Sequence, residues 1–282
     1  MYNPSPCQMN TKINVPAHFM RKLFFTFALI VLGFSRTQAA QPDFAKIFQG
    51  KDGCFVLYDL KTDKVKCQYN SARCATRFAP CSTFKITIAL MAFDKGILRD
   101  ENTTYKWDGV VRWNPNWNRD TSAAEWLKYS VVWYSQRITP QLGPVAITNY
   151  LAEFDYGNQD ISGGLTNFWL GSSLKISANE QIEFLKKLWR NQLPVSDRAM
   201  TLTRKIVPLD VSSSGARLNG KTGSHATEKS ALGWFVGHLE TGDGEYLFAV
   251  NYTQDNPPAE KLPPGMISEN LCKEILGQLD LY

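Results

Sequence analysis

Residues 79–98 have the sequence APCSTFKITIALMAFDKGIL, in which a short polar stretch opens an almost uninterrupted apolar run. Because the run is apolar nearly all round, it predicts a buried helix. Ser82 and Lys85 are three residues apart at its start and would therefore share one face. Two hypotheses follow: the two residues form a catalytic pair, or Ser82 caps the helix while Lys85 extends to solvent.

The neighbours of Lys85 favour the catalytic hypothesis. Phe84 and Ile86 flank it, and burying a protonated amine among such side chains is costly, so the pKa of Lys85 should fall. Ser82 would lie at a helix N-terminus, where free backbone N–H groups stabilise an oxyanion.

A second Ser-x-x-Lys match shows that this motif is weak alone. Ser172 and Lys175 have the same spacing, but they precede the helix cap expected at Ser177, in loop or extended chain where residues three apart need not meet. Two more motifs follow the first pair in the chain: Ser-x-Val at residues 130–132 and Lys-Thr-Gly at residues 221–223. Together the three motifs are typical of serine enzymes that are acylated by β-lactams and related peptides.

The N-terminus has the pattern of an export signal. Its parts are a basic pair, Arg21-Lys22, an apolar run over residues 23–34, and the small-residue stretch Thr37-Gln38-Ala39-Ala40. The run is short for a membrane span, so we expect cleavage near Ala39 or Ala40. Residues 1–40 are thus predicted to be a signal peptide with an upstream extension, because Met20 is a second candidate start. Residues 41–282 would form a single domain with two lobes in the bacterial periplasm.

The charge balance argues against a nucleic-acid or membrane-surface partner. Four of the 31 basic residues lie in residues 1–40, which have no acidic residue, so 27 basic and 26 acidic residues remain in the mature chain. No apolar run of membrane length follows residue 34, so no membrane association is expected after cleavage. The sequence is compatible with both a monomer and a homodimer.

Five cysteines remain in the mature chain: Cys54, Cys67, Cys74, Cys81 and Cys272. Disulfides persist in an exported protein, but an odd count leaves at least one thiol free, and the pairing stays open. A metal site is not expected, because paired Cys-x-x-Cys spacing is missing and the two mature histidines are far away in sequence. Cys81, beside Ser82, is either a thiol nucleophile or, as its place at a helix start favours, a small buried apolar residue.

Strand patterns lie near both ends of the mature chain, and helix patterns lie between them. Alternating apolar residues with central turn residues predict hairpins at 54–70 and 230–252, and a helical pattern covers 267–281. The other expected elements are helices after the capping boxes Ser122…Glu125 and Ser177…Glu180, a helix opened by Thr139-Pro140 that ends near Tyr156-Gly157, and a short strand at 216–220. These elements predict an α+β fold, with an antiparallel sheet flanked by terminal helices and an inserted helical lobe.

With these motifs in order, the chain resembles the class D (oxacillinase-type) serine β-lactamases from about Phe44 to Leu281. The matching motifs are Ser82-Thr83-Phe84-Lys85, Ser130-Val131-Val132, Tyr156-Gly157-Asn158 and Lys221-Thr222-Gly223. The resemblance implies the serine β-lactamase/penicillin-binding fold and a β-lactam as the small-molecule substrate.

The resemblance also implies the roles of the site residues. Ser82 would be the nucleophile and Lys85, carboxylated by carbon dioxide or bicarbonate, the general base; no metal and no other cofactor is implied. Ser130 would relay a proton, and Lys221 would supply positive charge. The remaining implied residues are the backbone N–H groups of Ser82 and Ser224 as oxyanion hole, Val131, Trp169 and Leu170 as carbamate pocket, and Thr222, Gly223 and Ser224 as substrate contacts.

One departure from the family concerns the substrate carboxylate. Many class D enzymes have an arginine before the C-terminal helix, whereas this chain has Pro264 and Gly265 in that neighbourhood. Either the residues of the Lys-Thr-Gly-Ser stretch share the carboxylate or Lys261 reaches it, although a solvated surface lysine is the simpler interpretation of Lys261.

Other conspicuous residues have a structural and a functional interpretation. Trp107, Trp113 and Trp117 either hold their loop or form the wall of a substrate cleft, and the first is favoured. His225 lies close enough to the third motif to touch substrate, whereas His238 falls on a strand pattern. Neither histidine has an evident carboxylate partner in sequence, so a Ser-His-Asp triad is a poor alternative.

The leading functional hypothesis is hydrolysis of β-lactams. A penicillin-sensing domain, which stays acylated, is one alternative, and the lack of a second apolar span argues against it. A D,D-peptidase shares all three motifs, but the Tyr-Gly-Asn element and the Trp169 region favour a class D enzyme.

Overall fold

The computed structural model describes residues 41–258 and 262–282, so the predicted signal peptide and Lys261 lie outside the described residues. The strands are β1 (Asp52–Asp59), β2 (Lys64–Tyr69), β3 (Thr104–Tyr105), β4 (Thr121–Ser122), β5 (Leu209–Val211), β6 (Arg217–Ala226), β7 (Ser230–Glu240) and β8 (Glu245–Asp255). The α-helices are α1 (Phe44–Ile47), α2 (Ser71–Cys74), α3 (Lys85–Asp94), α4 (Ala123–Lys128), α5 (Val132–Glu153), α6 (Ala178–Trp189), α7 (Asp197–Ile206) and α8 (Pro264–Gln278). Two 3₁₀ turns, η1 (Cys81–Phe84) and η2 (Pro115–Trp117), complete the elements.

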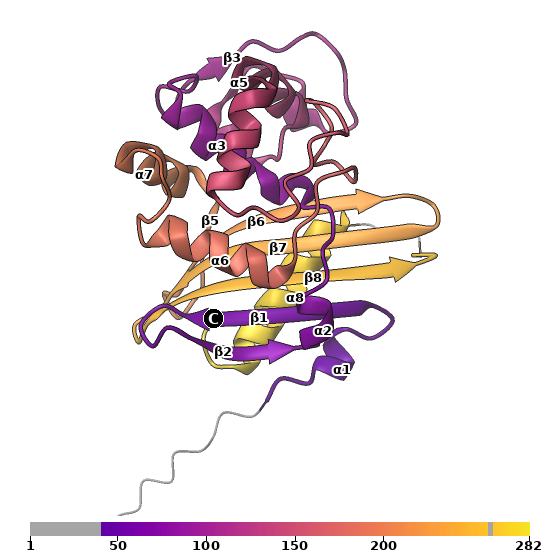
Figure 1. The fold of residues 1–282 in the computed structure, drawn as a ribbon. Coiled ribbons are helices and arrows are strands. Elements are labelled where there is room, and N and C mark those ends of the chain that lie inside the picture. Colours follow the sequence, from indigo (N-terminus) through magenta and orange to yellow (C-terminus); the bar gives the residue numbers. More distant parts are fainter. Residues whose placement is uncertain (1–40, 259–261) are drawn as a thin grey trace, which may run out of the picture. The chain divides into compact units, whose positions relative to one another are not determined.

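Six strands form one antiparallel sheet with the order β2-β1-β8-β7-β6-β5 (Figure 1). Both predicted hairpins are confirmed, as β1–β2 and β7–β8. The interior strands β1, β7 and β8 are buried along most of their length, which fits their nearly continuous apolar sequences. The first and last strands of the chain are thus neighbours inside one sheet, because β1 pairs with β8.

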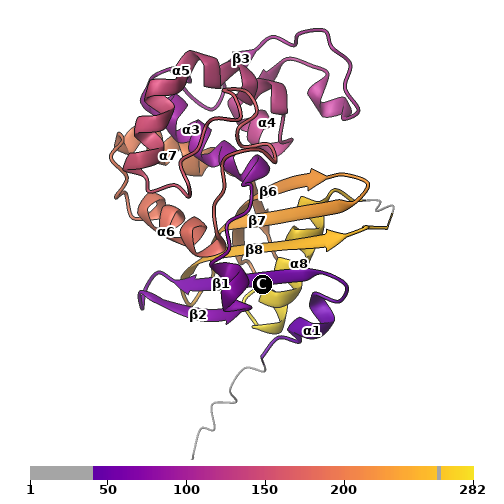
Figure 2. The ribbon, with the colours of Figure 1, turned by 45° about the vertical axis from the view of Figure 1, so that its right-hand side comes forward.

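Helices cover both faces of this sheet (Figure 2). On one face, α1 and α8 pack over a core that includes Phe55, Phe248 and Ile275. On the other face, α6 lies against β1 and β8, and a larger core continues into the helical lobe. The predicted α+β architecture, with terminal helices and an inserted helical lobe, is therefore confirmed.

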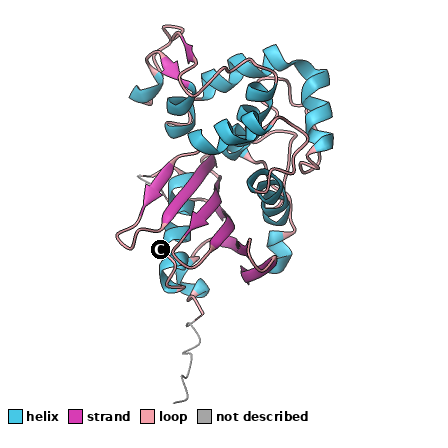
Figure 3. Ribbon diagram, turned by 90° about the vertical axis from the view of Figure 1, so that its left-hand side faces the viewer, coloured by secondary structure: helices cyan, strands magenta, loops and turns pink. Residues whose placement is uncertain are grey.

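The helical lobe is built around α3, which packs against α5 and α7. Figure 3 shows most of the helices gathered on one side of the sheet. Every residue of α3 from Lys85 to Phe93 is buried, as its all-round apolar sequence predicts. Both predicted capping boxes are present, at the starts of α4 and α6. Among the described residues, no helix is both long enough and apolar enough to cross a membrane.

Two predicted boundaries are wrong. The helix expected to open at Thr139-Pro140 begins instead at Val132, and the break lies at Gly143, whose φ of 75° and ψ of 162° are not helical. Pro144 then opens the second helical segment, where a missing backbone N–H costs no hydrogen bond. The Lys-Thr-Gly motif was expected after a short strand at 216–220, but β6 runs on through it to Ala226.

Candidate active site

Ser82 and Lys85 meet where the 3₁₀ turn η1 passes into α3. Lys85 Nζ donates a hydrogen bond of 2.8 Å to Ser82 Oγ. Ser82 is half-buried, whereas Lys85 is 0% exposed. The cap hypothesis is therefore wrong, because no side chain caps either helical element and Lys85 does not reach solvent. The second match is not such a pair, since Ser172 and Lys175 lie in a loop of bends and turns.

The surroundings of Lys85 disfavour its charged form. Burial, and then the positive charge of Lys221, lower the pKa of Lys85 well below its usual value of 10.5. Desolvation destabilises an ammonium ion because apolar side chains cannot replace its water shell. The neutral amine form of Lys85 is thus favoured more than it is for an exposed lysine.

A second serine–lysine contact joins segments that are distant in sequence. Lys221 on β6 is 2% exposed, and its Nζ donates to Ser130 Oγ over 3.1 Å and to the Thr222 carbonyl over 3.1 Å. Burial lowers the pKa of Lys221 to about 7, although the charge of Glu269 on α8 opposes this shift. Ser130 has a left-handed φ of 56° in the loop between α4 and α5. All three motifs of the sequence therefore meet at one place.

Gly223 allows β6 to approach the nucleophile turn. A Cβ at this position would lie 2.8 Å from the Pro80 carbonyl oxygen and 3.2 Å from the Thr83 methyl carbon. The next strand reinforces this contact, because Trp234 Nε1 donates to the Ala79 carbonyl over 2.9 Å. The glycine of the Lys-Thr-Gly motif is explained by this close backbone packing.

We predict that Gly223→Ala lowers kcat/KM for the β-lactam substrate that the resemblance implies by about 10²-fold, because the new methyl group must push β6 away from the serine turn by about one ångström or less. Steady-state kinetics of the purified variant measure this. The matched control is Gly242→Ala in the β7–β8 turn, where an added Cβ meets nothing within 4 Å. Equal kinetics in the two variants would contradict the prediction.

The segment Phe168–Leu170 packs directly against η1. Cys81 donates its backbone N–H to the Trp169 carbonyl over 3.0 Å, and the Phe84 and Trp169 rings lie 6.0 Å apart. Trp169 is 0% exposed, yet its indole Nε1 has no hydrogen-bond partner among the described residues. Val131 is fully buried and Leu170 half-buried. A buried donor without a partner is rare, so this indole marks a place for an acceptor.

The Tyr-Gly-Asn element holds the loop that carries Trp169. Gly157 has a φ of 57°, and a Cβ there would lie 2.0 Å from the Lys175 carbonyl oxygen, so only glycine fits. Asn158 Oδ1 accepts the Lys175 N–H over 2.8 Å, and its Nδ2 donates to the Ser173 carbonyl over 2.9 Å. Both ends of the loop are thereby joined. Tyr156 is fully buried beside Phe84.

The far end of the Lys-Thr-Gly strand contacts the start of α8. Ser224 is exposed, and its Oγ accepts the Gly265 N–H over 2.8 Å. A Cβ at Gly265 would lie 2.8 Å from the Gly223 carbonyl oxygen, so a larger residue does not fit there without rearrangement. As the backbone stands, position 265 therefore has no room for an arginine side chain.

Several features of the site were missed from the sequence. Cys81, next to Ser82, is 0% exposed and has a left-handed φ of 51°, which is uncommon for a residue other than glycine. Burial raises the pKa of its thiol to about 12, which makes it a poor nucleophile, so the interpretation that the sequence favoured, a small buried apolar residue, is confirmed. Nothing in the neighbouring sequence indicates the left-handed backbone of Cys81. The effect of Glu269 on the pKa of Lys221 likewise has no sequence signal.

Two of the three tryptophans at 107–117 hold their loop. Trp107 Nε1 donates to the Val110 carbonyl over 3.0 Å, and Trp117 Nε1 donates to the Tyr129 carbonyl, next to Ser130, over 2.8 Å. Trp113 is 76% exposed and stands 5.5 Å from the Trp117 ring. The interpretation that these residues hold their loop is therefore confirmed for Trp107 and Trp117.

The histidines do not form a triad with Ser82. His225 is half-buried, and its ring packs against Gly171. His238 does have a carboxylate partner, which the sequence did not reveal: its Nε2 lies 3.2 Å from Glu245 Oε2, and its ring stacks on Trp189. This pair lies at the other end of β7 from the serine turn.

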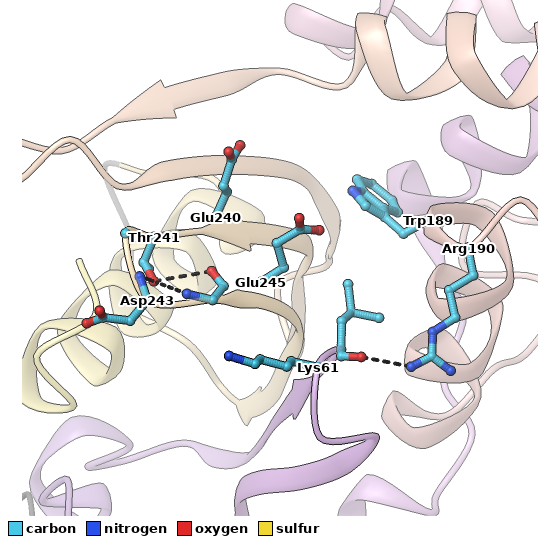
Figure 4. A pocket seen from close by; sticks show the side chains of 10 residues that line it. Lys61, Trp189, Arg190, Glu240, Thr241, Asp243 and Glu245 are labelled. Carbon is cyan, nitrogen blue, oxygen red and sulfur yellow. Dashed lines mark hydrogen bonds between the residues drawn. The ribbon is translucent and has the colours of Figure 1, made fainter.

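A cavity of about 530 Å³ lies at that distant end, between the β1–β2 turn, the end of α6 and the β7–β8 turn (Figure 4). Arg190 donates there to the Leu60 carbonyl, and Glu240, Asp243 and Glu245 supply acidic groups. The cavity has no serine or cysteine in its lining. Within residues 41–258 and 262–282, no three His, Cys, Asp or Glu side chains gather closely enough to hold a metal ion.

The fold and the two serine–lysine contacts define a serine enzyme of the penicillin-binding group, and residues 53–277 match the penicillin binding protein transpeptidase domain. The chain is 44% identical to β-lactamase OXA-1 of Escherichia coli over 216 residues, 73% of this chain and 78% of that protein. It is 38% identical to β-lactamase OXA-48 of Klebsiella pneumoniae over 209 residues, 74% of this chain and 77% of that protein. A solved class D β-lactamase from Bacillus subtilis superposes with a TM-score of 0.76 at 36% identity, covering 84% of this chain and 95% of that one. The protein belongs to the class D β-lactamase family.

Proposed function

We propose that the protein hydrolyses β-lactam antibiotics through a serine acyl-enzyme, with Ser82 as nucleophile and carboxylated Lys85 as general base. The observation that carries the proposal is the 2.8 Å contact between Ser82 and a Lys85 that is 0% exposed. A serine is a weak nucleophile unless a base is placed next to its hydroxyl. The β-lactamases OXA-1 and OXA-48 are relatives over about three quarters of this chain, which supports the substrate class.

Several observations support a carbamate on Lys85. Only a neutral amine attacks carbon dioxide, and burial favours the neutral form of Lys85. The unpartnered indole N–H of Trp169 is a donor for an anionic oxygen, and Val131 and Leu170 would exclude water from it. The charge of Lys221, which destabilises a protonated Lys85, would stabilise a negative charge at the same place.

In the acylation step, Ser82 Oγ attacks the β-lactam carbonyl carbon, the amide C–N bond breaks, and the ring nitrogen takes up a proton. Ser130 would give that proton, and the Lys221 amine, 3.1 Å from its hydroxyl, would replace it. A lysine with a pKa of about 7 exchanges protons readily at neutral pH. With carbon dioxide bound, the Lys85 side chain would supply an anionic base for both steps. It would accept the proton of Ser82 and release it as Lys221 and Ser130 protonate the ring nitrogen. It would then take a proton from the hydrolytic water and return it to Ser82 Oγ as the ester bond breaks.

The backbone N–H groups of Ser82 and Ser224 would bind the developing oxyanion, each contributing about 3 kcal/mol. Gly223 sets the spacing between these two residues, because it keeps β6 against the serine turn. Lys221, Thr222 and Ser224 would share the substrate carboxylate, since this chain has Pro264 and Gly265 in the neighbourhood of the arginine of many class D enzymes. Ser224 Oγ already accepts the Gly265 N–H, so its own O–H is available to donate.

Incubation of the purified protein with a chromogenic cephalosporin separates this proposal from its alternatives. A hydrolase gives sustained multiple turnover. A stoichiometric burst without turnover would instead indicate a penicillin-sensing domain, and turnover of D-Ala-D-Ala peptides alone would indicate a D,D-peptidase.

We predict that activity depends on dissolved carbon dioxide in a pH-dependent way. The folded-state pKa of Lys85 is depressed, so the amine is neutral above that value and protonated below it, where it no longer takes up carbon dioxide. Turnover in carbon dioxide-depleted buffer should fall as the pH is lowered from alkaline to mildly acid values and recover on addition of bicarbonate, an effect of about 10²-fold or more. Turnover that bicarbonate does not restore would refute the carbamate.

We also propose that residues 1–40 direct export to the periplasm and are removed near Ala39 or Ala40. The basic pair Arg21-Lys22 before an apolar run supports this. N-terminal sequencing of the protein from a periplasmic extract tests the cleavage site, and size-exclusion chromatography decides between monomer and homodimer.

A further inference from the structure

Two of the five described cysteines, Cys54 and Cys74, lie together in the core and outside the active site. Both are 0% exposed and belong to the same core cluster, on the α6 face of the sheet. Cys67 and Cys272 pack in the cluster on the opposite face. We propose that Cys54 and Cys74 form a disulfide bond when the protein folds in an oxidising environment.

The strand register fixes where Cys54 points. Cys54 of β1 pairs with Asn251 of β8, and cross-strand partners project to the same face of a sheet. Arg73 of α2 is 6% exposed and donates its Nε to Asn251 Oδ1 over 2.9 Å. Its NH1 also binds Asp52 of β1 over 2.7 Å. The short helix α2 is therefore held over the strand position that Cys54 occupies.

Cys74 follows Arg73 and is directed into the same place. Its Sγ donates to the Phe55 carbonyl over 3.6 Å and to the Tyr69 carbonyl over 3.3 Å, so it lies beside the backbone of the residue after Cys54. The two thiols are near enough to shift each other's pKa, which is raised for Cys54 and lowered for Cys74. Thiols this near need only small side-chain movements to be joined.

The local charge provides a reactive thiol. The interaction with the Cys54 thiol and the nearby Arg73 cation lower the pKa of Cys74. The interaction with Cys74 and burial raise the pKa of Cys54. Because both side chains are 0% exposed in the folded protein, the exchange takes place before the core closes, and Cys74, the more easily ionised of the two, reacts first. It attacks one sulfur of a disulfide oxidant and releases one thiol; the Cys54 thiolate then attacks Cys74 Sγ and releases the second thiol. Two electrons pass to the oxidant, and the two cysteine protons end on the released thiols.

The bond would hold the start of the segment that leads to the nucleophile. Cys74 ends α2, and the chain runs from there through Phe78 to the serine turn at Cys81–Phe84. A crosslink between residues 54 and 74 restricts the unfolded chain and so stabilises the folded state. It involves no residue of the proposed mechanism, so its existence and the β-lactamase activity are tested separately.

The test is differential alkylation of the wild-type full chain. The reduced, unfolded protein is refolded in a buffer of reduced and oxidised glutathione, then unfolded again and treated with N-ethylmaleimide with or without a reductant. Peptide mass spectrometry should show that Cys54 and Cys74 react only after reduction, whereas Cys67 reacts in both samples, and should detect the crosslinked peptide pair. Labelling of Cys54 and Cys74 without reductant, or a crosslink to another cysteine, would overturn the proposal.

A thermal measurement gives a second readout. A reductant should lower the unfolding midpoint of the oxidised wild-type protein by about 5–10 °C. Cys74→Ala should show no response to the reductant, while the matched control Cys67→Ala, another buried cysteine, should respond like the wild type. A wild-type midpoint that a reductant leaves unchanged would contradict the stabilising bond, whatever the stability of the variants.

Discussion

Replacing Ser82 with alanine is expected to lower turnover of a chromogenic cephalosporin by about 10⁵–10⁶-fold, as loss of a catalytic serine does in other serine hydrolases. The hydroxyl of Ser82 accepts the hydrogen bond from Lys85, and we propose that it is the atom that attacks the carbonyl carbon. Without that oxygen no ester can form. Intact-protein mass spectrometry should therefore find no mass increase after incubation with penicillin, in addition to the loss of turnover.

The chain supplies a matched control for this experiment. Ser172 has the same spacing to Lys175 but lies in a loop, so Ser172→Ala should keep activity within a few-fold of the wild type. Because Ser82 is only half-buried, its replacement should leave the unfolding midpoint nearly unchanged, and a folding defect would not account for the loss. An acyl adduct trapped in Ser82→Ala would assign the nucleophile to another residue.

Those parts of the structure that depend on local sequence were predictable. Helix caps such as Ser122 with Glu125 act over three residues, and the turn Thr241–Gly244 joins neighbouring strands. The contact between Ser82 and Lys85 is local in the same sense, because both lie on one helical face. For these features the spacing of the residues in the sequence is enough to predict their contact in the structure.

Contacts between distant segments could not be derived in this way. Lys221 reaches Ser130 across ninety-one positions of sequence, and Gly265 packs on Gly223 only because α8 returns along β6. Lys221 and Ser130 were assigned to one site only through the family resemblance of the ordered motifs. Their separation in sequence does not reveal their distance in space. The unusual φ of Cys81 has no sequence signal, because its conformation is imposed by contacts with the Trp169 segment.

Replacing Lys85 with alanine is expected to separate the two halves of the reaction. Ser82 and its oxyanion donors remain, so slow acylation should continue, but no group is left beside the ester to take a proton from water. Deacylation should slow by about 10²–10⁴-fold, the usual contribution of a positioned base. Mass spectrometry should then show a penicilloyl adduct on Ser82 that persists long after the wild-type protein has released it, and bicarbonate should not restore turnover.

Since Lys85 is completely buried, its truncation to alanine also leaves a cavity. Lys85→Met fills most of that space with an uncharged chain of similar length, so it should match the acyl-enzyme lifetime of Lys85→Ala while unfolding closer to the wild-type temperature. Lys175→Ala, in the second Ser-x-x-Lys match, should deacylate at the wild-type rate. If the adduct of Lys85→Met were hydrolysed as fast as that of the wild type, water activation would have to be assigned to another group, and among the buried amines of the site only Lys221 would remain as a candidate.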